Sequence, residues 1–314
     1  MSLRRIASAP LFLLAACGPS ADPIDAGSDA PLALDAPEGS DAPVPPVDAG
    51  PQRVEVFTAL GAGSEGIAIG HDAAGASRIF LALRDDRIVS VAPDGTVSDL
   101  ATIDAPVGIA FREPGEIIAC ASADGASGLF SITLDGTVTM LTNESPDGLF
   151  GLTNFVAIAP DGSLVFTDSM ANRVYRADAD GTNVTQITDA VTYPNGLAFS
   201  PDGTRLYIAS WSTTTLYVAS FEGGSYGTPM PIVEGVGSVD GIVARGASEL
   251  VLITSSTGGL VVDITMPTAD PVTYFDRRAI AVPANAVFGD ETFGEDELFV
   301  SALGAPSLFV VHPE

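Results

Sequence analysis

Six positions at nearly regular intervals carry side chains that could hold a cation. Their spacings are 42, 47, 41, 45 and 45 residues, and the positions are Glu65, Val107, Asn154, Asn195, Asp240 and Asn285. Five of the six side chains bear oxygen, and none of them is His or Cys. Hard divalent cations such as Ca²⁺ prefer oxygen ligands, and two carboxylates would offset much of the ion's charge. The six positions therefore predict a shared cation site, provided that the fold brings them together.

Each position also has a local explanation. Asn-Gly and Asp-Gly are common turn pairs, so Asn195 in "NGLAFSPDGTRLYIAS" could merely belong to the hairpin that turns at Pro201-Asp202-Gly203. For a single position the turn explanation is the better one. Five polar residues at six equivalent repeat positions favour a shared site instead.

The stretches that begin at these positions resemble one another, and they must be the elements that position the six side chains. They read "EGIAIGHDAAGASRIFLAL", "VGIAFREPGEIIACAS", "NFVAIAPDGSLVFTDS", "NGLAFSPDGTRLYIAS", "DGIVARGASELVLITS" and "NAVFGDETFGEDELFVSA". Short apolar or alternating runs separated by Asp-Gly turns predict strands and hairpins, and no helical period is visible. A repeat of about 40–50 residues is typical of one propeller blade. We therefore predict an all-β fold, a six-bladed β-propeller over residues 52–314. A seven-bladed ring would need a seventh leading position, which the sequence lacks.

The last repeat predicts how the ring closes. After Asn285 only about three strands remain, around Val287, at 298–302 and at 307–312. The strand-like segment at about 53–59 can add the fourth strand to the last blade and so protect its edge.

In this architecture all six leading residues stand at one face of the ring, here called the mouth face. Strands two and three of each blade join at the same face, so we also expect Asp168-Ser169, Trp211, Ser255-Ser256 and Ser301 there. Trp211 would either stack on a ligand or pack between blades, and Asp168 would either support the site or form a turn. The connection at 142–153 is the candidate lid, with Leu149 and Phe150 making the entrance apolar.

Several of these stretches resemble the SMP-30/gluconolactonase/luciferin-regenerating-enzyme family, and more distantly strictosidine synthase and the paraoxonases. They are "SEGIAIGHD", "NGLAFSPDGTRLYIAS", "VDGIVA" and "NAVFGDETFGEDELFVSAL", and the resemblance covers about 52–314.

The resemblance implies hydrolysis of a lactone or related ester. It implies that Glu65, Asn195 and Asp240 are metal ligands, that Asn154 contacts metal or substrate, and that Asp240 is also the general base. Asn285 and Trp211 are expected to contact the substrate. Ca²⁺ is the expected ion, with Mn²⁺ and Zn²⁺ as alternatives.

Two departures from the family pattern keep another function open. Where sugar lactonases tend to carry Arg-x-Asn-Asp, this chain has Leu152-Thr153-Asn154-Phe155, which argues against sugar-acid recognition. The chain also lacks the His pair implied for paraoxonases, since His71 and His312 are expected at the surface or in turns. The alternative is a non-catalytic propeller that binds a ligand or protein and uses the cation structurally.

The N-terminal residues predict export and lipid attachment. Residues 1–16 combine two arginines, a short apolar run and small residues, and "LAAC" ends at Cys17 like a lipobox. Residues 18–51 are rich in Ala, Asp, Pro, Gly and Ser, and are expected to form a disordered tether. We therefore expect a cell-envelope lipoprotein whose only membrane contact is its lipid. Gly18 after the cysteine favours the outer membrane, with the propeller in the periplasm or at the cell surface.

The charge of the chain argues against some partners. The formal net charge is −27, which disfavours nucleic acid and anionic membrane surfaces and favours cations. With Cys17 assigned to the lipid, Cys120 has no partner for an intrachain disulfide and is expected to be a small buried core residue.

Overall fold

A computed structural model of the chain describes residues 52–266 and 270–313. The predicted signal segment, Cys17 and the tether at 18–51 lie outside these residues. The described part is built from strands and turns, and no helix in it is long and apolar enough to cross a membrane.

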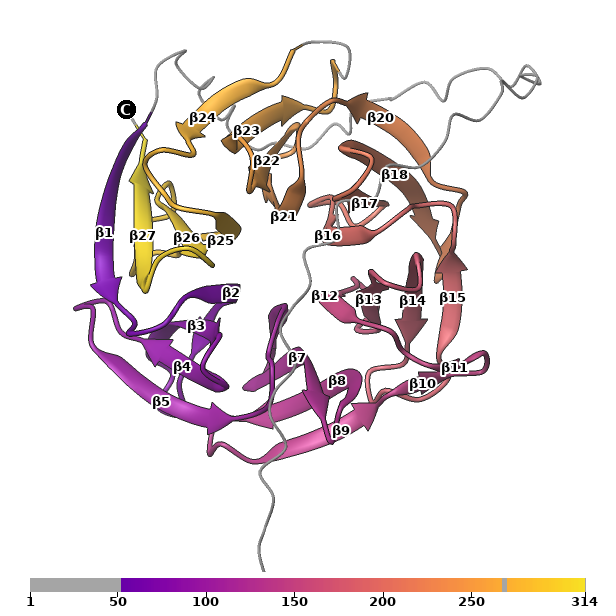
Figure 1. The fold of residues 1–314 in the computed structure, drawn as a ribbon, viewed down its shortest axis with the longest axis horizontal. Coiled ribbons are helices and arrows are strands. Elements are labelled where there is room, and N and C mark those ends of the chain that lie inside the picture. The colour runs from indigo at the N-terminus through magenta and orange to yellow at the C-terminus, as the bar shows by residue number, and fades with distance from the viewer. Residues whose placement is uncertain (1–51, 267–269, 314) are drawn as a thin grey trace, which may run out of the picture. The chain divides into compact units, whose positions relative to one another are not determined.

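Six antiparallel sheets, the blades, follow one another around a ring (Figure 1). Blade 1 comprises β2 (Ser64–His71), β3 (Ser77–Leu83), β4 (Arg87–Val91) and β5 (Val97–Thr102). Blade 2 comprises β6 (Ile109–Arg112), β7 (Glu116–Ala123), β8 (Ala126–Thr133) and β9 (Val138–Thr142). Blade 3 comprises β12 (Thr153–Ile158), β13 (Leu164–Asp168), β14 (Arg173–Ala177) and β15 (Thr185–Thr188).

The second half of the chain repeats this plan. Blade 4 comprises β16 (Pro194–Phe199), β17 (Arg205–Ser210), β18 (Thr215–Glu222) and β20 (Met230–Glu234), with the short β19 (Ser225–Tyr226) also paired to β18. Blade 5 comprises β21 (Val239–Arg245), β22 (Glu249–Thr254), β23 (Gly258–Asp263) and β24 (Val272–Asp276). Blade 6 comprises β25 (Pro283–Phe288), β26 (Leu298–Ala302), β27 (Ser307–His312) and β1 (Arg53–Ala59).

Blade 6 joins the two ends of the described chain. Its strand order is β1-β27-β26-β25, and β1 pairs antiparallel with β27 from Arg53 opposite His312 to Ala59 opposite Ser307. The closure predicted from 53–59 is therefore confirmed. The pairing gives β27 a hydrogen-bonded neighbour in place of an open edge, as Figure 1 shows.

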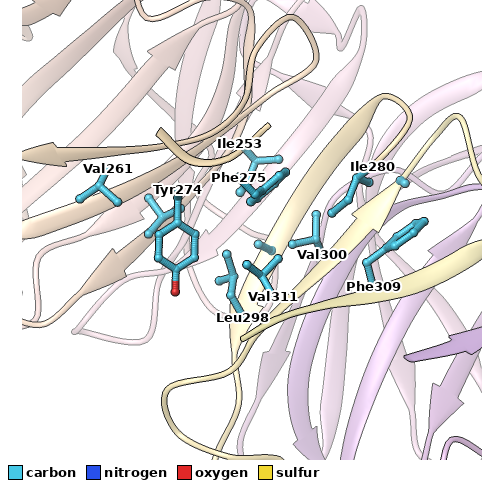
Figure 2. Packing of buried hydrophobic residues seen from close by; sticks show 12 residues of the cluster. Ile253, Val261, Tyr274, Phe275, Ile280, Leu298, Val300, Phe309 and Val311 are labelled. Atoms are coloured by element: carbon cyan, nitrogen blue, oxygen red, sulfur yellow. The ribbon is translucent and has the colours of Figure 1, made fainter. Parts of the chain in front are cut away.

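The hydrophobic core is divided into six clusters, one between each pair of neighbouring blades. Figure 2 shows the cluster between blades 5 and 6, where Ile253 and Phe275 approach Val300 and Val311. This arrangement follows from the sequence, because alternate residues of a strand point to opposite faces of its sheet and each face meets a neighbouring blade. The second strand β13 is buried throughout, and its residues Leu164 to Phe166 place apolar side chains on both faces of the sheet.

Cys120 belongs to the cluster between blades 2 and 3 and is a buried free cysteine, as predicted. Burial raises the pKa of its thiol. A buried thiol of this kind packs as a small apolar side chain and does not act as a nucleophile.

Close packing of the inner strands explains the glycine that follows several leading residues. A Cβ on Gly66 would lie 2.2 Å from the carbonyl oxygen of Val107 in the next blade, and one on Gly241 would lie 2.1 Å from Oδ1 of Asn285. These distances are too short for any side chain. The repeated glycine is therefore a packing requirement between blades as well as a turn preference.

We expect Gly66→Ala to lower the free energy of unfolding by at least about 1–3 kcal/mol, because the added methyl group forces blades 1 and 2 apart. Urea denaturation monitored by circular dichroism measures this change. A variant as stable as the wild type would show that these inner strands do not approach as closely as described.

Candidate functional site

Five of the six leading residues lie in the inner strands of their blades. Glu65 is in β2, Asn154 in β12, Asn195 in β16, Asp240 in β21 and Asn285 in β25. The three asparagines and Asp240 are buried, and Glu65 is mostly buried. The sixth position, Val107, lies before β6, so blade 2 contributes neither a polar side chain nor a strand residue at this level.

Hydrogen bonds between neighbouring blades hold the leading residues in a ring. Ser301 Oγ donates to the carbonyl oxygen of Glu65 at 2.5 Å and lies 3.2 Å from that of Asn285. The amide of Gly108 donates to the carbonyl oxygen of Asn154 at 2.8 Å, and Thr167 Oγ1 donates to that of Asn195 at 3.2 Å. The structure thus brings together residues that are far apart in the sequence, as the repeat predicted.

Asn195 and Asp240 form the most direct side-chain contact of this ring. Nδ2 of Asn195 donates to Oδ1 of Asp240 at 2.8 Å, and both residues are buried. This bond fixes the orientation of the Asn195 amide, so its Oδ1 points elsewhere. Oδ1 is buried and has no hydrogen-bond partner among the described residues. A buried acceptor without a donor is costly, and a bound cation or water at this place would satisfy it.

Glu65 and Asp240 form a pair of interacting carboxyl groups. Burial raises the pKa of Asp240 to about 7, although the bond from Asn195 opposes this shift. The pKa of Glu65 is raised to about 8, first by burial and then by the negative charge of Asp240, while the positive charge of Arg84 opposes the shift. Two buried carboxyl groups that share one region repel each other when both are ionised. A nearby cation would remove this repulsion.

The donor set fits a hard divalent cation. It combines the two carboxyl groups with the unpaired Oδ1 of Asn195, and Asn154 stands on the neighbouring blade. Within 52–266 and 270–313 no group of three or more His, Cys, Asp or Glu residues is arranged to hold a metal ion. An ion held here would therefore be bound by two carboxylates together with neutral amide oxygens, which is chemistry that suits Ca²⁺ better than softer metals.

Asp168 fixes the backbone that leads to Asn154. Its carboxylate accepts hydrogen bonds from the amides of Gly151 and Leu152 at 2.8 Å each, and from Ala171 at 3.1 Å. Asp168 is buried and serves as a turn-forming and positioning residue. Asp168 was predicted either to form a turn or to support the site. The structure shows that it forms the turn, and this turn positions the strand that carries Asn154.

Tyr193 is a residue of this region that the sequence did not single out. Burial raises its pKa, and the negative charges of Asp240 and Glu65 raise it further. Its φ is +46°, which is a strained value for a bulky side chain, and its amide donates to Oδ1 of Asn172 at 2.8 Å. Its ring packs on Trp211 with centroids 5.6 Å apart, and Trp211 remains 41% exposed.

The prediction of an apolar lid at 142–153 is wrong in two respects. Phe150 does not line the entrance, because it is buried against Phe166 and Tyr175 in the core between blades 2 and 3. The segment folds into a hairpin of β10 (Glu144–Ser145) and β11 (Gly148–Leu149), which lies at the outer side of the ring in Figure 1. An ion pair of 2.9 Å between Asp147 and Arg173 attaches it there, and of the two apolar residues expected at the entrance only Leu149 is exposed.

The two histidines lie away from the acidic pair. His71 ends β2, at the opposite end of that strand from Glu65, and its Nε2 lies 2.8 Å from Oε2 of Glu113. His312 ends β27, and its Nδ1 lies 2.7 Å from Oε2 of Glu297. Neither histidine is placed to act at the leading residues.

Comparison with known proteins agrees with this architecture. The SMP-30/gluconolactonase/LRE-like region matches residues 71–275, a range that includes Asn154, Asn195 and Asp240. A gluconolactonase from Xanthomonas campestris is 22% identical, with a TM-score of 0.70 over 84% of this chain and 90% of the other. The calcium-binding protein regucalcin from Agrobacterium tumefaciens is 18% identical, with a TM-score of 0.66 over 84% and 95%.

Curated relatives match a shorter part of the chain. Strictosidine synthase-like protein 6 from Arabidopsis thaliana is 36% identical over 132 residues, which are 36% of this chain and 35% of the relative. Strictosidine synthase-like protein 7 from the same plant is 34% identical over 119 residues, covering 32% and 31%. The chain thus spans about a third of the length of the curated relatives that it matches.

Proposed function

Because this chain belongs to the SMP-30/gluconolactonase/LRE-like family, we propose that it is a metal-dependent hydrolase of a lactone or related ester. The observation that carries this proposal is the buried group formed by Asn195, Asp240 and Glu65, in which an unpaired amide oxygen accompanies two carboxyl groups with raised pKa values. The family indicates the type of reaction, and these three residues are the ones that would bind the cation and activate water.

Four side chains would hold the cation: Glu65, Asn154, Asn195 and Asp240. A divalent cation held by them would supply positive charge that polarises a substrate carbonyl and stabilises negative charge on its oxygen. Ca²⁺ is the proposed ion because all the donors are oxygens, and Mn²⁺ and Zn²⁺ are the alternatives. Regucalcin, a fold neighbour, is described as a calcium-binding protein.

Asp240 is the proposed general base. Its Oδ1 accepts the bond from Asn195, which holds the carboxylate in place and leaves the second oxygen to take a proton from water. The water oxygen then bonds to the carbonyl carbon, the ester C–O bond breaks, and the proton passes to the leaving alkoxide. Asn285 and Trp211 are proposed to contact the substrate beside this group.

A panel of lactones and aryl esters tests the proposal. The chain is stripped with EDTA and assayed before and after addition of Ca²⁺, Mn²⁺ or Zn²⁺. We expect hydrolysis that disappears on stripping and returns with one of these ions, and we expect Glu222→Ala, an exposed acidic control, to behave like the wild type. Absence of cation-dependent hydrolysis across the panel would contradict the proposal.

A non-catalytic propeller with a structural cation is the second candidate, and the replacement at Phe155 favours it. Phe155 stands where the sugar lactonases tend to carry an Asp, and it packs into the core between blades 3 and 4. Cation binding without hydrolysis in the panel above would support this candidate over the enzyme.

We also propose that the protein is exported and anchored in the cell envelope by a lipid on Cys17, favouring the outer membrane, with residues 18–51 as a tether. We expect the wild type expressed in a bacterial host to incorporate labelled palmitate and to sediment with membranes. The Cys17→Ser variant should do neither, because the thiol that accepts the lipid is gone. Equal labelling of both proteins would contradict lipid attachment at this residue.

A further inference from the structure

Three exposed apolar side chains stand at the mouth face, each on a different blade. Trp211 follows β17, and Met170 lies between β13 and β14, so both lie where second and third strands join. Val282 directly precedes β25 and has a left-handed φ of +50°. Their exposed fractions are 41%, 68% and 44%. Of the three, Trp211 is the one that packs against Tyr193, two residues before Asn195.

Tyr193 connects Trp211 to the acidic pair, because Asn195 two residues further on donates to Asp240. It lies two residues before Asn195, and its ring packs on Trp211. Its carbonyl oxygen accepts the Trp211 amide at 3.1 Å, and its own amide is held by Asn172. Three contacts thus fix a bulky residue in a strained backbone conformation. Strain of this kind persists only where the surrounding structure enforces it.

We propose that Tyr193 and Trp211 form an aromatic wall that selects lactones or esters carrying an aromatic or alkyl substituent. The substituent would lie on the exposed part of Trp211 while the ester group faces Asp240 and Glu65. This inference deepens the proposed function and rests on it for the position of the ester group.

Physical reasons favour an apolar substituent over a sugar. An apolar group gains by removing the half-exposed Trp211 ring from water, and aromatic rings add favourable stacking geometry. A sugar ring would instead have to exchange its hydroxyl–water hydrogen bonds for contacts with aromatic and aliphatic surface. Leu152 stands where the sugar lactonases tend to carry Arg, and this replacement also favours an apolar substituent over a sugar.

The single tryptophan of the chain provides a test that does not depend on catalysis. The probes are the lactams of γ-butyrolactone and of γ-phenyl-γ-butyrolactone, whose amide bonds resist hydrolysis. We expect the phenyl lactam to change the fluorescence of Trp211 and to bind about 10-fold or more tightly than the unsubstituted lactam. The Tyr193→Ala variant should bind the two lactams with similar affinity, whereas Tyr193→Phe should still bind the phenyl lactam more tightly.

Kinetics with the two parent lactones supplies the second readout. We expect the phenyl lactone to have the larger kcat/KM, and Trp211→Ala to raise KM for it while leaving kcat nearly unchanged. Met230→Ala, which removes an equally exposed side chain from the outer strand β20, should change neither value. Circular dichroism confirms that each variant is folded.

The outcomes separate this inference from the proposed function. Hydrolysis without preference for the phenyl lactone, together with unchanged fluorescence, would overturn the aromatic wall and leave the hydrolase intact. A fluorescence response and selective lactam binding without any hydrolysis would support the wall as a ligand site and overturn the hydrolase. Equal effects of Met230→Ala and Trp211→Ala would also overturn the wall.

Discussion

We expect Asp240→Asn to lower kcat for lactone hydrolysis by roughly 10²–10⁴-fold, the usual contribution of a general base. The amide keeps the size of the carboxylate and can still accept the hydrogen bond from Asn195, so the geometry of the ring should survive. What it cannot do is take a proton from water. The measurement is steady-state kinetics at saturating cation.

The same substitution should leave the cation-free protein as stable as the wild type or more stable. It removes one of two buried carboxyl groups that repel each other, since the charge of Asp240 raises the pKa of Glu65. Comparing kcat with the melting temperature therefore separates lost chemistry from lost structure. Activity within a few-fold of the wild type would contradict the role of Asp240, and so would a loss of activity that merely follows unfolding.

The stability of the cation-free protein should fall as the pH rises from about 4 to about 8. In the unfolded chain both carboxyl groups ionise near pH 4. In the folded chain their pKa values are raised, to about 7 for Asp240 and about 8 for Glu65. The folded state therefore binds more protons than the unfolded state across this range, and the free energy of unfolding decreases with pH. The stabilising contribution is fully present below pH 4 and is lost above the raised values.

Even one unit of pKa difference corresponds to about 1.4 kcal/mol, so denaturant unfolding in EDTA at a series of pH values should resolve the effect. The double variant Glu65→Gln with Asp240→Asn is the matched control. Its free energy of unfolding should decrease less with rising pH, because neither side chain titrates. Excess Ca²⁺ should raise stability most at the alkaline end, where both carboxylates are ionised. A wild type and a double variant with the same pH dependence would show that the pair is not buried as described.

The propeller could be predicted from the sequence because its physical constraints repeat. Each blade must start an inner strand at the same height, so the leading residues recur at nearly constant spacing, and their clustering follows from the ring. The glycine after several of them recurs because no Cβ fits against the next blade. The closing strand β1 was predictable from the missing fourth strand of blade 6.

Features set by contacts between blades could not be predicted. Tyr193 precedes a proline, and residues before proline favour extended backbone, so nothing local announces its left-handed conformation. Phe150 stands in a polar, turn-rich segment, where an aromatic that plugs the core looks the same in sequence as one that lines an entrance. In both cases the deciding contacts come from other parts of the chain.

The most direct test of the central claim is calorimetric titration of Ca²⁺ into the EDTA-stripped protein. We predict one site per chain in the wild type, lost in Glu65→Gln and retained in the exposed control Glu222→Ala. Saturation at 100 times the dissociation constant should stabilise the wild type by about 2.7 kcal/mol. No binding of Ca²⁺, Mn²⁺ or Zn²⁺ to the wild type, or unchanged binding in Glu65→Gln, would contradict a cation site built from these leading residues.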